Sequence, residues 1–116
     1  MEREEDSVRE NYSVRISENA LINIDEIVGY IAFIKHQPDN ATKVGDALYK
    51  KIERIAIHPH VYRECEGLTT KAKIYRKANC LSWQIIFKIN SLEVLILGII
   101  HHSRKPSGLE KLKKIK

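Results

Sequence analysis

The chain has 116 residues, which is enough for one domain but too few for two domains of ordinary size. Hydrophobic residues make up 43% of it, so a buried core can form. No stretch of about 18 apolar residues is present, which excludes an ordinary membrane-spanning helix. Residues 1–10 are mostly charged and lack the apolar segment of a secretory signal, so the expected location is cytoplasmic.

The net charge of +5 is unevenly distributed. Residues 1–11 contain five acidic and two basic side chains, whereas residues 104–116 contain six basic and one acidic. We therefore expect an acidic N-terminal extension over 1–11 and a basic C-terminal tail over 107–116. Such a tail suits an anionic partner, either nucleic acid or an acidic protein segment, although lysine-rich termini also serve solubility alone. Cys65 and Cys80 form no CxxC pair and are expected to be free thiols.

The first half of the chain predicts a strand followed by two helices. Residues 12–16 alternate apolar and polar side chains, as in a half-buried strand, and Ser17 can cap the helix that follows. The helix should end near Lys35 or His36, because Pro38 cannot continue it. Its apolar stripe comprises Leu21, Ile24, Ile27, Val28, Ile31 and Ile34.

A second helix should begin after a cap at Asp39 or Asn40 and stop before Pro59. Its apolar stripe comprises Val44, Leu48, Ile52 and Ile55. Because the connection between the two helices is short, we expect an antiparallel helical hairpin.

Three strands are predicted in the second half, after a loop over 59–72. They cover residues 73–77, 81–89 and 93–101, and the last two are joined by a turn at 90–91. The last strand is apolar on both faces, which predicts a central position. The order β-α-α-β-β-β indicates an α+β fold with the helical hairpin on one face of a small, mostly antiparallel sheet.

The sheet has a second apolar face that includes Ile86, Leu95 and Leu97. The helical hairpin can cover only one face, so the other must be covered by the C-terminal tail, by a second copy or by a partner. We expect a partner, which makes the chain a binding module; the alternative is that the tail folds back over this face.

Residues 12–106 resemble the RelE/ParE superfamily of toxins from type II toxin–antitoxin systems. The similarity lies in the order and spacing of several weak motifs rather than in one distinctive motif. The segments that carry it are YSVRISENAL at 12–21, DEIVGYI at 25–31, IERIAIHP at 52–59, IYRK at 74–77, WQIIFKI at 83–89, VLILGIIH at 94–101 and RKP at 104–106. The resemblance implies a toxin domain that a cognate antitoxin neutralises.

The superfamily contains two kinds of activity. RelE-like members cleave mRNA in the ribosome without a metal, which needs an acid, a base and a cation at the phosphate. In this chain His101, His102, Arg76 and Arg104 could supply such a set. However, Ser82 stands near the point where nucleases usually carry an arginine, and no tyrosine follows in the tail.

ParE-like members bind and poison DNA gyrase instead. The first helix with Asp25, Glu26 and Tyr30, and the stretch 52–59, are more similar to this branch. We therefore expect a ParE-like toxin that acts by binding rather than by chemistry. A ribosome-dependent mRNA endoribonuclease is the alternative, and a degenerate toxin that only binds an antitoxin is a third possibility.

The expected partners are a cognate antitoxin and DNA gyrase, or the ribosome and mRNA in the alternative, within a dimer or a toxin–antitoxin hetero-oligomer. No cofactor, metal or membrane is expected, and His58 and His60 lack the companions of a zinc site. Trp83 is expected in the core, or beneath the antitoxin if its face of the sheet is open. The expected partner-binding residues are Arg76, Lys77, Ile86, Leu95, Leu97, Arg104 and Lys105.

Overall fold

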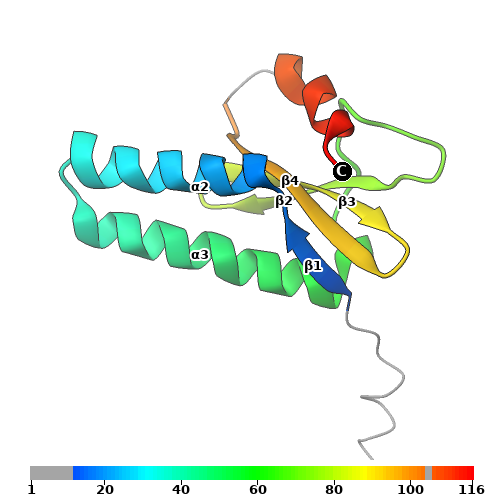
Figure 1. Cartoon of the computed structure of the whole chain (residues 1–116), viewed down its shortest axis with the longest axis horizontal. Helices are drawn as coiled ribbons and strands as arrows, with labels where there is room; N and C mark the ends of the chain where they lie inside the picture. The colour runs from blue at the N-terminus through cyan, green and yellow to red at the C-terminus, as the bar shows by residue number, and fades with distance from the viewer. Residues whose placement is uncertain (1–11, 104–105) are drawn as a thin grey trace, which may run out of the picture.

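The computed structural model describes residues 12–103 and 106–116, the side chains of 106 and 107 excepted. A short strand, β1 (Ser13–Ile16), leads into α2 (Glu18–Gly29), which continues as a π-helical turn, η1 (Tyr30–Ile34). A second helix, α3 (Pro38–Ile57), runs back alongside the first (Figure 1). The predicted antiparallel helical hairpin is confirmed, and both predicted C-terminal helix ends fall within one or two residues of those observed. The predicted cap at Asp39 or Asn40 is wrong: α3 begins at Pro38, whose fixed φ suits the first helical position, and Gln37 is the N-cap.

The strands form one four-stranded sheet in the order β1-β4-β3-β2. Its members in the second half are β2 (Tyr75–Cys80), β3 (Trp83–Asn90) and β4 (Glu93–His101). The pairs β2–β3 and β3–β4 are antiparallel, whereas β1 pairs with β4 in parallel. The α+β prediction is confirmed, and so is the central place of the last strand.

The second strand is displaced from its predicted position at 73–77. It begins at Tyr75 and runs on to Cys80, and a two-residue turn at Leu81 and Ser82 joins it to β3. Leu81 has a φ of 55°, a backbone conformation that favours glycine or asparagine. Leucine is not a residue typical of turns, which is why the sequence pattern placed Leu81 at the start of the next strand.

The helical hairpin covers one face of the sheet and forms the main core with it. Ser17 caps α2 as predicted: its side chain accepts a hydrogen bond from the N–H of Ala20 at 3.0 Å. The predicted burial of Leu21 and Ile34 is wrong, since they are 41% and 63% exposed. The hairpin extends beyond the sheet (Figure 1), so residues near its tip have no layer beneath them.

The opposite face of the sheet is covered by the chain itself. The loop after α3 begins with a 3₁₀ turn, η2 (Pro59–Val61); its later residues Cys65, Leu68 and Ile74 lie over this face, together with a C-terminal 3₁₀ helix, η3 (Pro106–Lys114). Of the three covers considered for this face, the structure therefore shows the tail. The buried residues of this second core are Cys65, Leu68, Tyr75, Ile86, Leu95, Leu97, Leu109 and Leu112.

A close fit holds the C-terminal segment in place. A Cβ on Gly67 would lie 2.7 Å from Leu109, and one on Gly98 would lie 3.2 Å from Leu112, so each leucine occupies space that the glycine leaves open. No helix within residues 12–103 and 106–116 has the length and apolar character needed to cross a membrane.

Candidate partner-binding groove

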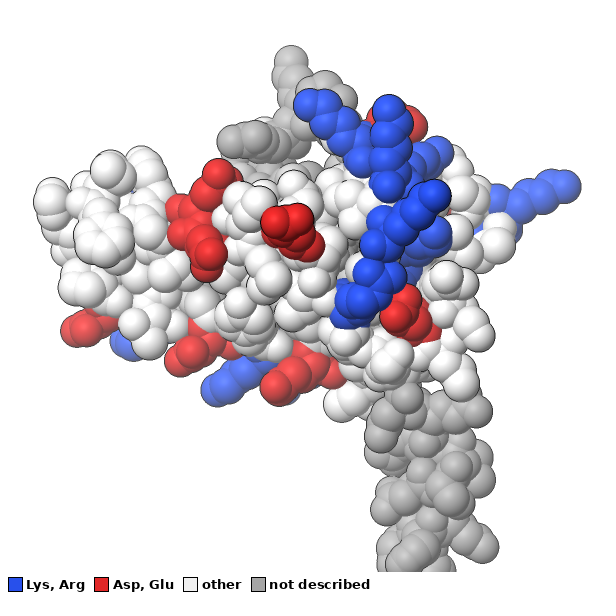
Figure 2. All heavy atoms as spheres, in the orientation of Figure 1, with Lys and Arg blue, Asp and Glu red and all other residues white. Residues whose placement is uncertain are grey.

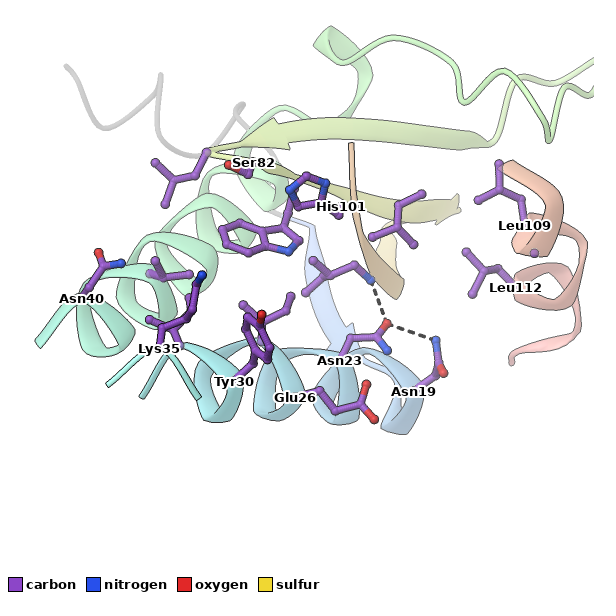
Figure 3. Close-up of a pocket in the computed structure, with 18 of the residues that line it drawn as sticks. Asn19, Asn23, Glu26, Tyr30, Lys35, Asn40, Ser82, His101, Leu109 and Leu112 are labelled. Atoms are coloured by element: carbon purple, nitrogen blue, oxygen red, sulfur yellow. Dashed lines mark hydrogen bonds between the residues drawn. The ribbon is translucent and has the colours of Figure 1, made fainter. Parts of the chain in front are cut away.

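A groove of about 910 Å³ lies between the helical hairpin and the end of the sheet where β4 finishes. One wall is α2 with η1, the start of α3 closes one end, and the C-terminal segment closes the other, with Leu109 and Leu112 at its border (Figure 3). The floor is formed by the β2–β3 turn and the adjoining parts of β3 and β4. The groove is thus bounded by elements that are distant in sequence.

The π-helical turn positions the aromatic wall of the groove. The N–H of Lys35 donates to the carbonyl of Tyr30 at 3.1 Å, five residues earlier, which widens the helix at this point. Tyr30 itself is 53% exposed and lines the groove, as does Lys35 (Figure 3). Such single π turns are frequent at functional sites.

Two asparagines join α2 to a β-bulge in the central strand. The register between β3 and β4 shifts at Ile86/Phe87, opposite an extra residue in β4. The side-chain carbonyl of Asn23 accepts the N–H of Ile99 at 2.9 Å, and the amide of Asn19 donates to the carbonyl of Leu97 at 2.9 Å. Ordinary ladder pairing does not continue through a bulge, so these side chains satisfy its backbone groups and fix the helix wall to the floor.

An aromatic cluster lines the floor. Trp83 packs against the main core, as predicted, but it is only partly buried and also lines the groove. The ring of His101 meets the ring of Trp83 edge-on at 5.8 Å and stacks on the ring of His102 at 4.9 Å. The floor therefore offers a rigid, flat surface to an apolar side chain.

Hydrogen bonds fix the roles of the ring nitrogens of the two histidines. The backbone N–H of Ser103 donates to Nδ1 of His101 at 3.2 Å, so that nitrogen is an acceptor. Nδ1 of His102 lies 2.9 Å from the carbonyl oxygen of Ser82 and must donate a proton to it. The Nδ1 atoms of both rings are thus engaged in hydrogen bonds within the chain, at the end of β4.

Arg76 lies apart from the histidines, in another part of the sheet. It pairs with Phe87 of β3, whereas His101 pairs with Trp83. The four-residue step from Trp83 to Phe87 corresponds to about 13 Å along the strand. The guanidinium of Arg76 donates to the carbonyls of Lys73 at 2.8 Å, His60 at 2.9 Å and Tyr62 at 2.8 Å.

These bonds hold the 59–74 loop against β2, so Arg76 stabilises the loop. Arg76 does not lie beside the two histidines. Lys77 is only 15% exposed at its side chain and pairs with Glu66 at 3.7 Å. Arg104 and Lys105, also expected at the site, lie outside the described residues.

The apolar residues predicted to meet a partner are buried. Ile86, Leu95 and Leu97 are 0%, 3% and 0% exposed beneath the C-terminal segment and the 59–74 loop. The open groove instead presents residues that sequence reasoning did not assign to partner binding, above all Leu81, which is 65% exposed. Its position in a tight turn gives no signal in the sequence. Tyr30 and Glu26, noted for their resemblance to the ParE branch, do line the groove.

Comparison with known proteins identifies the family. The model of one family, described as the ParE toxin of the type II toxin–antitoxin system parDE, matches residues 14–106. The chain therefore belongs to the ParE toxin family, within the class of type II toxin–antitoxin toxins. A search of curated proteins finds no match.

Two solved structures show the same fold. The chromosomal ParDE toxin–antitoxin system from P. aeruginosa has a chain similar to this one, with 16% identity and a TM-score of 0.61; the match covers 78% of this chain and 95% of that one. The toxin–antitoxin complex RelBE2 from Mycobacterium tuberculosis gives 15% identity and a TM-score of 0.54, covering 82% and 95%. At these identities the likeness concerns the fold.

Proposed function

We propose that the chain is a growth-inhibiting toxin that acts by binding DNA gyrase and that a cognate antitoxin neutralises it by occupying the groove. Membership of the ParE toxin family supports the toxin role, and the similar solved structures are toxin–antitoxin systems. The observation that carries the choice of binding over RNA cleavage is the state of Arg76, whose guanidinium is taken up by three backbone carbonyls. A phosphate would have to compete with all three bonds.

The groove suits a segment of an antitoxin. Tyr30, Trp83 and Leu81 offer exposed or partly exposed apolar surface for anchoring side chains. Glu26 adds a carboxylate on the helix wall, which can receive a basic side chain of the partner (Figure 3). Because α2 and β4 are joined by the asparagine bonds, the groove is preformed and loses little conformational entropy on binding.

The alternative is a ribosome-dependent mRNA nuclease, favoured by the stacked His101 and His102 at the open end of the sheet. Induction of the chain in cells, followed by analysis of mRNA ends and plasmid supercoiling, separates the two. A gyrase poison leaves transcripts intact and causes filamentation with loss of supercoiling. Transcript cleavage at ribosomal A-sites that His102→Ala abolishes would overturn the proposal and establish the nuclease.

Antitoxin binding is tested with groove variants. Co-expression of the cognate antitoxin should rescue growth from the natural chain. Leu81→Glu should keep toxicity but lose this rescue, because a charge in the groove must be desolvated on binding. Leu92→Glu is the matched control, since Leu92 is 51% exposed in the β3–β4 turn and does not line the groove. Rescue that is equal for both variants would place the antitoxin elsewhere.

A further inference from the structure

The face of the sheet opposite the helices carries a row of basic side chains. In the register of the sheet, Arg15 of β1 pairs with Leu95 of β4, and Leu95 pairs with Lys88 of β3. Leu95 is part of the second core beneath the C-terminal segment, so Arg15 and Lys88 flank that core on the same face. The two cations stand on either side of the buried leucine.

The C-terminal segment adds four more cations to this face. Its apolar residues Leu109 and Leu112 are buried against the sheet, and the lysines between and after them are exposed. The guanidinium of Arg15 donates to the carbonyl of Lys116 at 2.9 Å and so fixes the end of the segment beside β1. Figure 2 shows basic side chains gathered over this part of the molecule. The exposed lysines of the segment are Lys111, Lys113, Lys114 and Lys116.

We refer to Arg15, Lys88 and these four lysines as the basic band. Arg15 adds little to its net charge, because the two carboxylate oxygens of Glu93 accept from its guanidinium at 3.3 and 3.4 Å. Glu110 lies 3.9 Å from Lys113 in an exposed pair, where ion pairs are weak, so the charge of the lysines is largely kept. The band thus keeps an excess of positive charge.

The rest of the molecule shows no such excess. Residues 12–58, which include the helical hairpin, contain six basic and six acidic side chains. The described residues after 58 contain ten basic and four acidic side chains. The excess of positive charge therefore lies in the described residues after 58, which hold all five lysines of the basic band, and this asymmetry orients the molecule in the field of a polyanion.

We propose that the basic band binds the phosphate backbone of duplex DNA. All but one of its members are lysines, which are flexible point charges suited to phosphate rather than to reading base edges. The large aromatic side chains that are clearly exposed, Tyr30, Phe33 and Tyr49, lie on the helical hairpin, on the other side of the sheet. The band therefore lacks the stacking platform that single strands require, and its binding is independent of sequence.

The dimensions of the segment fit a short contact. The nine residues of η3 in a 3₁₀ helix extend over about 18 Å, roughly half of one turn of B-form DNA. One strand has a phosphate about every 3.4 Å of helix axis, so about five phosphates lie along this length, enough for each lysine of the segment to meet one. The contact goes beyond the proposed binding of gyrase and antitoxin, since every member of the basic band except Lys111 lies outside the groove.

The test is fluorescence anisotropy with the full chain and a labelled 20-base-pair DNA duplex at several salt concentrations. Contacts with three to four phosphates give a slope of log affinity against log salt of about −3, or about 60-fold weaker binding between 50 and 200 mM salt. The triple variant Lys113→Ala, Lys114→Ala, Lys116→Ala, which leaves the groove residue Lys111 in place, should lose most of this slope, about one unit per lysine. The lysines are exposed, so circular dichroism should remain unchanged.

The matched control removes the same charge from the opposite side. Lys43→Ala, Lys50→Ala, Arg54→Ala lies on the exposed surface of α3 and should retain the full salt slope. Three results would overturn the proposal: absence of binding at 50 mM salt, an equal loss in the control, or tighter binding of polyglutamate or of an RNA duplex of the same sequence. None of these results bears on gyrase inhibition, which is measured separately.

Discussion

The leucines of the C-terminal segment offer the most direct test of how this fold is completed. Leu112 is 8% exposed and fills the space above Gly98 on the far face of the sheet. Leu112→Ala removes three buried carbons, worth about 0.8 kcal/mol each, so the free energy of unfolding should fall by about 2.4 kcal/mol. The segment lies at the surface and can settle into the space, so no large cavity penalty is added.

Urea denaturation measures this difference. With an m-value of about 1.5 kcal/mol/M, the expected loss lowers the midpoint by about 1.6 M at unchanged m. Leu81→Ala is the control, because Leu81 is 65% exposed and its truncation should change the free energy of unfolding by less than about 0.5 kcal/mol. If the two variants were equally stable, the segment would not cover the sheet in solution. The far face, with Ile86, Leu95 and Leu97, would then be open to a partner.

Three further predictions concern the groove, the 59–74 loop and the thiols. Asn23→Ala should lower the free energy of unfolding by about 1–3 kcal/mol in thermal unfolding, because the N–H of Ile99 loses its acceptor. Asn23→Asp keeps an acceptor and should keep most of the stability. Equal losses in the two variants would show that this hydrogen bond does not stabilise the fold. Arg76→Lys should lower the free energy of unfolding by about 2 kcal/mol and speed amide hydrogen exchange in the 59–74 loop, because lysine cannot reach all three carbonyls. Unchanged exchange in the loop would contradict this structural role. Burial raises the pKa of the Cys65 and Cys80 thiols, so the folded state holds these protons more tightly than the unfolded state does. The contribution of these thiols to the free energy of unfolding should therefore be fully present below their ordinary pKa of 9.0 and should decline as the pH rises above it. A Cys65→Ala, Cys80→Ala variant should show a smaller decline between pH 8.5 and 9.5 in urea denaturation, and an identical decline would refute the assignment.

Much of the architecture follows from periodicity in the sequence. The stripe of Val44, Leu48, Ile52 and Ile55 predicts a helix, and all four residues are buried. Pro38 and Pro59 set helix limits that the structure retains within a few residues. These signals are local, because a covalent constraint or a repeating face is visible in a short window of residues. The boundary between β2 and β3 could not be predicted, because Leu81 lies in the turn between them and leucine is not a typical turn residue.

The sites were less accessible to sequence reasoning. Arg76 has the charge of a phosphate ligand, but three carbonyls from the folded loop occupy it. Leu95 and Leu97 have the hydrophobicity of an interface, but the C-terminal segment buries them. In each case the residue type is compatible with two roles, and the choice depends on which distant segment of the chain lies against it.

The sequence by itself determined the elements, their order and the membership of a toxin superfamily, because these depend on spacing along the chain. Tertiary structure alone decided which face of the sheet remains available. The C-terminal leucines find their place only after β4 is central and Gly67 and Gly98 leave room for them. The position of the groove follows from that packing, since burying the far face leaves the end of the sheet beside Tyr30 and Trp83 as the open surface.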